Sequence, residues 1–347
     1  MQKVQNKVLL LRPFTSNPRL GMMNDRFHEE KEQAMKIVML ERANVGSDFE
    51  MPDFGAFGEL TVYDYCKPEL VVERIKDADI VIMNKMPMNE ATLKDAHNLK
   101  LISVTATGTD NVDHEYCQSR GIAVRNAKGY STETVVQHTF AMFFYLYEHL
   151  PFYDTYVKDG SYIKCPTFTY FDNAFRELAG KTWGIVGLGT IGRRVAAVAS
   201  AFGCRVIYYS TSGVERKEDY ERADFETFLK ESDVISVHAP LNGATKGLFG
   251  AAAFDAMKES AIFLNLGRGP IVDEKDLADA LKENKIAGAG LDVLSREPMD
   301  ENNPLYEIKD SGKLIVTPHI AWASVEARKR LMEEIYRGVK EFVGAFP

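Results

Sequence analysis

Long apolar runs and an excess of positive charge are both missing from this sequence. Every apolar stretch is broken by Lys, Asp, Glu or Gly before it reaches the ~18 residues that a membrane-spanning helix needs. Lys and Arg number 42 against 50 Asp and Glu, which gives a formal net charge of -8. Nucleic-acid-binding proteins usually present a basic face. We therefore expect neither a membrane nor a nucleic acid as a partner.

Cysteine is also scarce. The chain has only four cysteines, Cys66, Cys117, Cys165 and Cys204, with no CxxC pair and no histidine cluster beside them. This spacing predicts neither a disulfide framework nor a zinc site. We expect free thiols, no metal, and a reducing, cytoplasmic setting.

What the chain does contain is enough apolar sequence for two domains. It has 347 residues, 45% of them hydrophobic and 27% charged, a balance typical of globular proteins with more than one core. The first apolar strand follows an internal methionine, Met35, and several basic residues precede the first acidic one, Asp25. Residues 1–34 are therefore interpreted as a leader outside the fold, either a loose tail or over-extended reading frame or, less favoured, an organelle presequence.

Short apolar runs alternate with segments of helical period from Lys36 onward, a pattern that predicts parallel sheets covered by helices. A first set of five strands suffices for one small doubly wound domain. Residues 134–147 are too long and too apolar for a strand and predict a buried helix that could link two domains. A second set of six strands matches the count of a complete dinucleotide-binding fold. The predicted strands are residues 36–40, 60–65, 79–84, 99–105 and 121–125, then 183–186, 205–209, 233–238, 261–266, 289–293 and 314–317.

A glycine-rich motif follows the first strand of the second set. Gly187, Gly189 and Gly192 form GxGxxG around Thr190 and Ile191, directly ahead of a helical segment. The first glycine permits a tight turn, the second lets a pyrophosphate approach the backbone, and the third lets helix and strand pack closely. The order strand, GxGxxG, helix predicts dinucleotide binding, with the phosphates at the helix N-terminus.

The end of the next strand leaves the choice of cofactor open. NAD-specific folds usually place an acid there to bind the adenine ribose, whereas this chain has Ser210, Thr211 and Ser212. With basic residues at 216 and 217, the 2′-phosphate of NADP would not be repelled, but acidic residues at 215, 218 and 219 also lie nearby. The sequence is compatible with NAD or NADP.

Three later strands lead into polar residues suited to hydride-transfer chemistry. Arg268, Glu297 and His319 follow successive strands, and ligands of open α/β sheets bind at the carboxyl ends of strands. His319 would exchange the proton of a substrate hydroxyl, Glu297 would hold its other nitrogen, and Arg268 would bind a substrate carboxylate and the reacting oxygen. Taken singly, Arg268 could instead be a surface cation, Glu297 a solvated loop carboxylate, and His319 a structural histidine. No metal is needed.

Several segments together resemble the D-isomer-specific 2-hydroxyacid dehydrogenase family. They are residues 106–113, 187–192, 232–241, 265–274, 290–298 and 317–324. The resemblance covers nearly all of the chain from Lys36 onward. It implies an NAD(P)-dependent oxidoreductase that acts on the CH-OH group of a small D-2-hydroxy acid, or reduces the matching 2-keto acid.

The resemblance also implies roles for individual residues. Arg268, Glu297 and His319 match the family's catalytic Arg, Glu and His, and Thr107 and Gly108 match a loop whose amides hold the substrate carboxylate. Asp292 matches an acid beside the nicotinamide amide. Further cofactor-binding positions implied are Thr190, Ile191, His238, Ala239, Pro240, Thr245, Leu266, Gly267 and Ala321.

The domain plan implied by the resemblance is an insertion. A Rossmann NAD(P)-binding domain of residues 134–319 would interrupt a flavodoxin-like substrate domain of residues 35–133 and 320–347, with the active site in the cleft between them. A homodimer is also implied, and residues 151–175, which are rich in aromatic side chains, are a candidate arm.

The substrate is less constrained. Residues 320–324 resemble those of glycerate dehydrogenases, also called hydroxypyruvate reductases, and an indole at Trp322 would narrow the pocket in favour of hydroxypyruvate or glyoxylate. Trp322 could equally be a packing residue. Lys85 could add a cation for the substrate or be a solvated loop lysine. A co-repressor-like protein of the same fold that senses dinucleotides is the alternative. Within enzymes, a formate or phosphonate dehydrogenase is a further option, and Glu297 disfavours the formate enzymes, which tend to carry Gln there.

Overall fold

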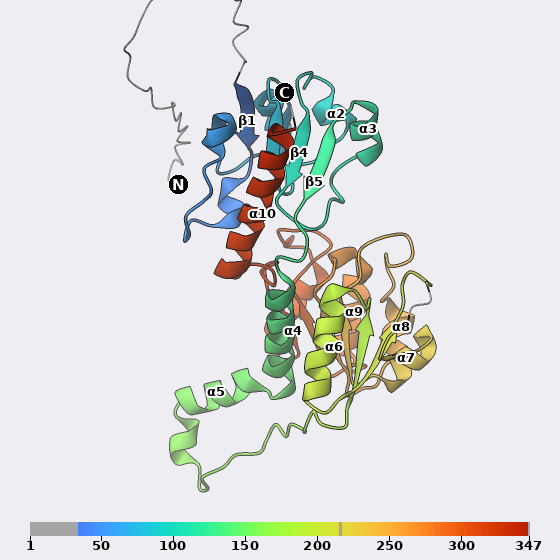
Figure 1. Cartoon of the computed structure of the whole chain (residues 1–347). Coiled ribbons are helices and arrows are strands. Elements are labelled where there is room, and N and C mark those ends of the chain that lie inside the picture. Colours follow the sequence, from blue (N-terminus) through green and yellow to red (C-terminus); the bar gives the residue numbers. More distant parts are fainter. Residues whose placement is uncertain (1–33, 215–216, 346–347) are drawn as a thin grey trace, which may run out of the picture. The chain divides into compact units, whose positions relative to one another are not determined.

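The computed structural model describes residues 34–214 and 217–345, and these residues form two compact units. Unit 1 contains the described residues up to Tyr130 together with those from Val325 onward, and unit 2 is Ser131–Ser324. The sequence predicted the divisions at 133/134 and 319/320. Of the predicted leader, only Ala34 is among the described residues. Figure 1 shows both units.

Unit 1 is built on a five-stranded parallel sheet, as predicted. The strand order is β2-β1-β3-β4-β5, the flavodoxin-like arrangement of a doubly wound fold. Parallel strands need crossover connections and are covered on both faces, so their residues read as continuous apolar runs. The strands are β1 (Met35–Met39), β2 (Gly58–Val62), β3 (Ile80–Met83), β4 (Leu101–Val104) and β5 (Ala123–Asn126).

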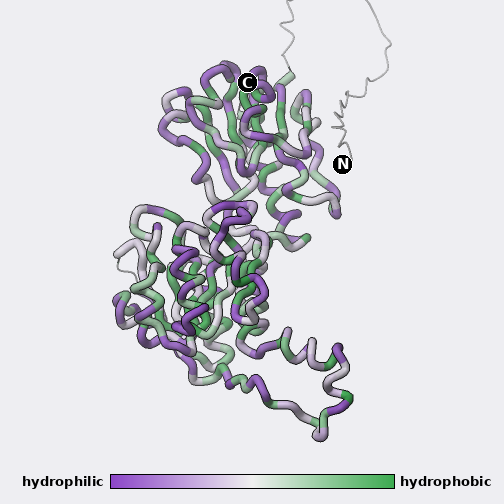
Figure 2. The backbone as a smooth tube through the Cα atoms, turned by 180° about the vertical axis from the view of Figure 1, so that it is seen from behind, coloured by the Kyte–Doolittle hydropathy of each residue, from purple (hydrophilic) through white to green (hydrophobic). Residues whose placement is uncertain are grey.

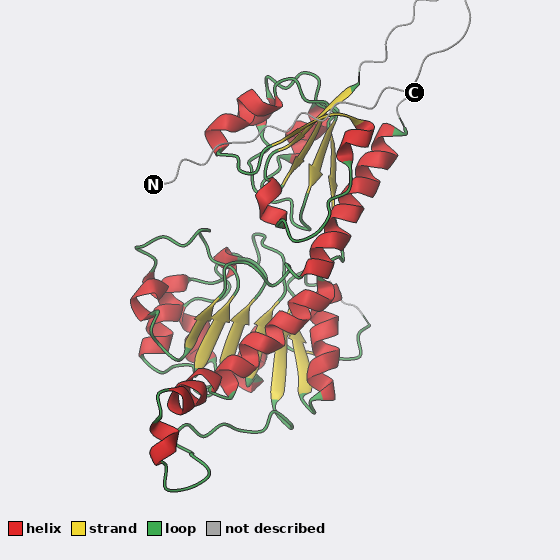
Figure 3. Ribbon diagram, turned by 90° about the vertical axis from the view of Figure 1, so that its left-hand side faces the viewer, coloured by secondary structure: helices red, strands yellow, loops and turns green. Residues whose placement is uncertain are grey.

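Helices lie on both faces of this sheet (Figure 3). The longest, α10 (Val325–Val343), returns from the C-terminal part of the chain and packs against β4. Its buried stripe includes Leu331, Ile335, Val339 and Phe342, at the three- and four-residue spacing of an amphipathic helix. Three short helices complete the unit: α1 (Val71–Ile75), α2 (Glu90–Leu93) and α3 (His114–Ser119).

Unit 2 contains a seven-stranded parallel sheet in the order β12-β11-β10-β9-β6-β7-β8. Relative to the first strand of the unit, this is the Rossmann order, and the strand sequence reverses direction between β6 and β9. Six strands were predicted; β8 was missed because it is only two exposed residues long, one Glu and one Arg. The strands are β6 (Thr182–Val186), β7 (Arg205–Tyr209), β8 (Glu221–Arg222), β9 (Val234–Val237), β10 (Ile262–Asn265), β11 (Gly288–Leu291) and β12 (Leu314–Val316).

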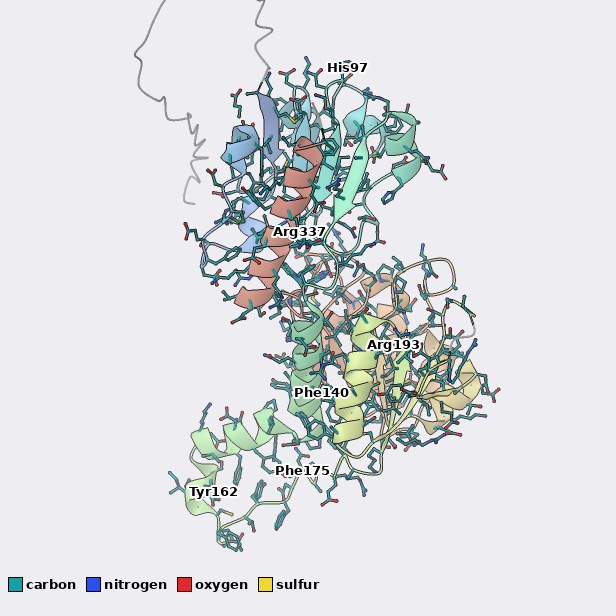
Figure 4. The ribbon with its side chains drawn as sticks, viewed as in Figure 1. His97, Phe140, Tyr162, Phe175, Arg193 and Arg337 are labelled. Atoms are coloured by element: carbon teal, nitrogen blue, oxygen red, sulfur yellow. The ribbon has the colours of Figure 1, made fainter. Side chains whose placement is uncertain are left out.

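The predicted buried helix is present as α4 (Thr132–Tyr147) and begins two residues earlier than expected. Phe140 and Phe143 of α4 pack on the completely buried indole of Trp183, with ring centroids 4.8 and 4.9 Å apart. The indole N–H donates to Ser236 Oγ at 2.9 Å, so the polar edge of the ring is satisfied. Figure 4 labels Phe140 on α4, and Figure 2 shows hydrophobic and hydrophilic segments alternating along the backbone of both units.

The remaining helices of unit 2 cover its sheet, except for one segment that extends away from it. They are α5 (Leu150–Lys158), α6 (Thr190–Ala201), α7 (Phe225–Glu231), α8 (Ala251–Ala256) and α9 (Glu274–Lys282). Residues 150–176, which we name the arm, include α5 and a short 3-10 turn, Ser161–Lys164. The arm projects from unit 2 in Figures 1 and 3.

Two further features of the described residues concern the helices and the cysteines. Across residues 34–214 and 217–345, no helix combines the length and the apolar character needed to cross a lipid bilayer. All four cysteines carry free thiols, and Cys117 and Cys204 are buried. Burial raises the pKa of the Cys204 thiol to about 11, so this thiol stays protonated at neutral pH.

Candidate active site

The glycine motif forms the turn between β6 and α6. Gly187 has a positive φ of 89°, and a Cβ there would lie 2.8 Å from the backbone of Ala239, so only glycine fits. A Cβ on Gly192 would lie 2.3 Å from the carbonyl oxygen of Gly187. These two glycines let α6 and the loop after β9 pack tightly on the turn.

Gly189 differs from the other two glycines. It is the N-cap residue of α6, makes no side-chain cap, and a Cβ on it would meet nothing within 4 Å. The first turn of α6, which includes Thr190 and Ile191, therefore presents backbone N–H groups beside open space. This cradle lies next to the β6/β9 reversal, where doubly wound folds bind nucleotides, and it suits the pyrophosphate of a dinucleotide.

The loop after β7 carries the hydroxyl groups predicted to face the adenine ribose. Ser210 Oγ lies 3.5 Å from Ser212 Oγ, and Ser212 Oγ accepts from the Val214 amide at 3.3 Å. Downstream, Glu218 accepts two hydrogen bonds from the guanidinium of Arg193, which raises the arginine's pKa. The sequence analysis cited the basic residue 216 in favour of NADP and the acidic residue 215 against it. Both residues lie outside the described residues.

The segment after β9 forms a closed loop. His238 N donates to Val186 O at 2.8 Å, and the completely buried Thr245 donates its hydroxyl to Pro240 O at 2.7 Å, so Thr245 shapes the loop. Both ring nitrogens of His238 are buried without a hydrogen-bond partner among the described residues. Desolvation lowers the pKa of His238 to about 3, so its imidazole is neutral at physiological pH.

Asn265, at the end of β10, holds the turn that carries Arg268. Its buried carboxamide accepts from Gly267 N and donates to Arg268 O, both at 3.0 Å. A Cβ on Gly267 would lie 2.9 Å from Ala239 O, so this turn, which begins at Leu266, packs on the loop after β9. Arg268 NH1 donates to Gly267 O at 2.9 Å. Sequence reasoning did not single out Asn265, although its place two residues before Gly267 is an Asx-type signal.

A close approach joins the Arg268 turn to the segment that leads to Glu297. A Cβ on Gly269 would lie 1.9 Å from the carbonyl carbon of Leu294, so the two backbones touch. Leu294 N donates to Glu297 Oε1 at 3.1 Å, which anchors the carboxylate on its own loop. Arg268 and Glu297 therefore belong to two loops packed against each other at one sheet edge.

His319 meets Glu297, as the sequence proposed. Nδ1 of His319 lies 2.7 Å from Glu297 Oε2, and both side chains are only partly exposed. Because a carboxylate only accepts, Nδ1 carries the proton, and the neutral ring therefore keeps its lone pair on Nε2. The backbone of His319 has a positive φ of 56°, and its N–H donates to Asp292 O at 2.8 Å.

Asp292 anchors the segment that carries His319. Its carboxylate is 2% exposed and accepts from Ile320 N, Ala321 N and the Thr317 hydroxyl at 2.9, 2.9 and 2.6 Å. The resemblance placed Asp292 beside the nicotinamide amide. The contacts add a second role, because they fix the backbone on both sides of His319.

His138 of α4 extends this network and was not identified from the sequence. Its Nε2 lies 3.0 Å from Thr317 Oγ1 and 3.6 Å from Asp292 Oδ1. Since the Thr317 hydroxyl donates to Asp292, it accepts from His138, which gives a chain from His138 through Thr317 to Asp292. The only sequence signal was a polar residue inside a helix rich in apolar side chains.

The remaining predicted substrate contacts divide between the units. Trp322 belongs to unit 2, whereas Lys85, Thr107 and Gly108 belong to unit 1, just after the carboxyl ends of β3 and β4. Lys85 is exposed, and its loop wraps around the buried carboxylate of Glu41. That carboxylate, also missed from sequence, accepts from the backbone amides of residues 84, 85 and 86 at 2.7, 2.9 and 3.3 Å.

The carboxyl ends of β10, β11 and β12, which are neighbours in the sheet, thus deliver Arg268, Asp292 and His319 to one edge. A permanent cation and an imidazole held by a carboxylate suit proton exchange on a polar carbonyl or hydroxyl group. In the part of the chain that the structure describes, no three His, Cys, Asp or Glu side chains are grouped as metal ligands. Fold and site define a dinucleotide-dependent oxidoreductase.

Comparison with known proteins agrees with this class. Residues 140–321 match the family described as D-isomer specific 2-hydroxyacid dehydrogenase, NAD binding domain. The chain is 39% identical to a glycerate dehydrogenase of Methylorubrum extorquens over 90% of this chain and 97% of that protein. It is 37% identical to a hydroxypyruvate reductase of Blautia hydrogenotrophica, over 90% and 98%.

A solved structure supports the same conclusion. D-lactate dehydrogenase of Aquifex aeolicus, complexed with NAD and lactic acid, aligns with a TM-score of 0.79 and 29% identity over 89% of this chain and 95% of that one. The protein belongs to the D-isomer specific 2-hydroxyacid dehydrogenase family. The fold class and the class of D-2-hydroxyacid dehydrogenase predicted from sequence are confirmed.

Proposed function

We propose that this protein reduces hydroxypyruvate or glyoxylate to D-glycerate or glycolate with NADH or NADPH. The observation that carries the proposal is the 2.7 Å contact between His319 Nδ1 and Glu297, which leaves Nε2 available for the substrate oxygen. The relatives named glycerate dehydrogenase and hydroxypyruvate reductase support this choice of substrate. Trp322, next to the His319 segment, is the proposed limit on substrate size.

The chain's own groups supply the proton and hold the substrate. A bound reduced nicotinamide supplies the hydride to the keto carbon. His319, protonated on both nitrogens and stabilised by Glu297, donates its Nε2 proton to the oxygen that becomes the hydroxyl group. Arg268 holds the substrate carboxylate and the reacting oxygen with its fork of N–H donors. The backbone of Thr107 and Gly108 and the ammonium of Lys85 are further proposed substrate contacts, on the family resemblance.

For the cofactor, we infer that the ribose pocket tolerates a 2′-phosphate. Ser210 carries no charge that would repel it, and the carboxylate of Glu218 is neutralised by Arg193. The N-terminal turn of α6, Leu266 and Gly267 are proposed to contact the rest of the dinucleotide. His238, Ala239 and Pro240 are proposed to border its adenosine half. A neutral His238 adds no charge there.

The test is a 340 nm assay of purified protein. Hydroxypyruvate, glyoxylate and pyruvate are each offered with NADH and with NADPH. Fast oxidation with hydroxypyruvate or glyoxylate supports the proposal and ranks the cofactors. If no combination gives NAD(P)H oxidation while fluorescence still shows NAD(P)H binding, the proposed substrates are wrong. A dinucleotide-sensing role would then be the better-supported function.

The arm also supports a homodimer. Ile163, Phe168 and Phe171 are 87, 88 and 76% exposed, and exposed apolar patches of this kind mark interaction surfaces. Within the arm, Tyr156 and Tyr170 stack with centroids 3.9 Å apart, which gives the arm a shape of its own. Figure 4 labels Tyr162 and Phe175 on the arm.

Light scattering after gel filtration tests this dimer. We expect a dimer for the wild type and a monomer for Phe168→Ser/Phe171→Ser. Tyr306→Ser, which alters a 47% exposed aromatic residue outside the arm, should leave the dimer intact. A monomeric wild type would refute the dimer without touching the proposed activity.

Free thiols further support a reducing compartment such as the cytoplasm.

A further inference from the structure

Unit 1 contains a polar cavity that the proposed reaction does not use. Its volume is about 350 Å³, within the range of small-molecule sites. It lies between α10 and the strands β4 and β5, which run side by side in Figure 1, and Figure 4 labels Arg337 on that helix. Its polar lining consists of Ser103, Arg125, Asn126, Lys128, Arg337 and the two carboxylates Glu334 and Glu341.

Ser103 is the most unusual residue of the lining. It sits in β4 on the sheet face opposite Ile102 and Val104, is 1% exposed, and its hydroxyl has no hydrogen-bond partner among the described residues. A buried hydroxyl left unpaired is destabilising. A residue that only filled space on this sheet face would need no hydroxyl, so the hydroxyl points to a polar ligand.

Positive charge is in excess around this hydroxyl. Arg125, paired with Ser103 across the strands, donates NH1 to Gly338 O at 2.6 Å and lies 3.4 Å from Glu341. Arg337 pairs with Glu334. Within residues 34–214 and 217–345, the Lys128 ammonium has no hydrogen-bond or ion-pair partner. Three cations against two carboxylates leave one positive charge uncompensated.

The cavity is connected to a loop that bears on function. Asn126 lines the cavity at the end of β5, and its Nδ2 donates to Thr107 O at 2.6 Å. Thr107 belongs to the loop proposed to bind the substrate carboxylate. A ligand bound in the cavity can therefore affect the position of that loop through the side chain of Asn126.

We propose that this cavity is a second ligand site, which binds a small anion bearing a carboxylate or a phosphate. Lys128 and the remaining N–H groups of Arg125 bind the charged group, and the Ser103 hydroxyl donates to one of its oxygens. The site lies outside the residues proposed to bind substrate and cofactor, and its existence does not depend on the identity of the reaction.

Calorimetric titration of the full-length protein tests the site. The probes are inorganic phosphate and citrate at constant ionic strength, with saturating NADH present so that the glycine turn is filled. We expect Lys128→Gln to weaken binding at least tenfold and Ser103→Ala several-fold. Lys94→Gln, which removes the same charge from an exposed position of unit 1 away from the cavity, should bind like the wild type.

Hydrogen exchange locates the probe. The bound probe should slow exchange in peptides that cover residues 101–128 and 331–343, and in no peptide around Gly187 or Arg268. Whether phosphate, citrate or both bind identifies the anionic group. Failure of both probes to bind, equal affinity of the wild type and Lys128→Gln, or protection confined to unit 2 would each overturn the proposal. Turnover is not measured, so a wrong substrate assignment cannot mimic these results.

Discussion

The Nδ1 nitrogen of His319 donates to Glu297 Oε2 at 2.7 Å from a residue whose backbone is left-handed, with φ at 56°. For a residue other than glycine, that conformation costs roughly 1–2 kcal/mol. Hydrogen bonds from His319 N to Asp292 O and to Thr317 O, at 2.8 and 2.9 Å, hold it in place. Local strain is therefore stabilised by the fold at the position that aims the imidazole.

Replacing His319 by alanine should remove the proton donor. We expect kcat for hydroxypyruvate to fall by about 10²–10⁴-fold, with NADH affinity nearly unchanged, as measured by stopped-flow and fluorescence titration. His149→Ala is the matched control, because His149 also has a positive φ, at 52°, but lies outside the site. Wild-type turnover in the first variant would eliminate His319 as the acid.

Glu297→Gln keeps a side chain that can accept from Nδ1 but removes the negative charge beside the imidazole. Because a neutral amide stabilises a proton donor in the transition state less well than a carboxylate does, kcat for hydroxypyruvate should fall roughly ten-fold or more at pH 7.5. Glu301→Gln, an exposed residue in the following loop, should retain the wild-type kcat. A wild-type kcat in Glu297→Gln would mean that the carboxylate only packs there.

Thr317→Val breaks the chain from His138 to Asp292 while preserving volume. We expect kcat to drop by about ten-fold, the equivalent of ~1.4 kcal/mol, because the backbone around His319 loses one anchor. KM for the keto acid should change little. Thr139→Val deletes another buried hydroxyl, one bonded only to Val135 O of its own helix at 2.7 Å, and should spare kcat. Equal kcat values for the two variants would contradict the positioning role of this network.

Ser210→Asp should reverse the tolerance for NADPH. A carboxylate at the end of β7 repels the 2′-phosphate and accepts from the ribose hydroxyls of NAD, so kcat/KM with NADPH should fall at least ten-fold relative to NADH. Ser260→Asp adds the same charge just before β10, at the amino ends of the strands, and serves as the control. An unchanged cofactor ratio would exclude Ser210 from the ribose pocket.

His238 predicts a pH dependence of stability. Its pKa is lowered from 6.5 to about 3 by burial, so between these values the unfolded chain binds a proton that the folded chain does not. Above about pH 7 His238 is neutral in both states and does not lower the free energy of unfolding. As pH falls below 6, proton binding to the unfolded chain lowers the free energy of unfolding by about 1.4 kcal/mol per pH unit. Urea unfolding from pH 7 to 4.5 should therefore show a shallower slope for His238→Asn than for the wild type, whereas exposed His97→Asn should keep the wild-type slope. Parallel slopes for His238→Asn and the wild type would refute the buried neutral imidazole.

Much of the fold was predictable because parallel strands buried on both faces leave a strong local signal. The apolar runs at residues 79–84 and 99–105 contain β3 and β4, though both strands end earlier than the runs. The short edge strand β8 carries no such signal, since it is polar and exposed. Its existence depends on pairing with β7 rather than on its own composition.

Within the site, residues that follow strands were predictable, and residues that support them were not. Arg268, Glu297 and His319 stand in recognisable motifs at strand ends. His138 contacts Thr317, which lies 179 residues away in the sequence. Glu41 contacts the loop after β3, which lies 43 residues away. Nothing local distinguishes them from other polar residues beside apolar segments.

The sequence alone determined the alternation of strands and helices, the glycine turn and the order of the polar residues along the chain, because periodicity, backbone freedom and turn chemistry are local properties. The tertiary structure decided which tautomer His319 adopts and which carboxylate anchors its backbone. It also decided that the hydroxyl of Ser103 is buried without a hydrogen-bond partner among the described residues. Those outcomes depend on burial and on partners far away in the chain. Their energies exist only once the sheets have assembled.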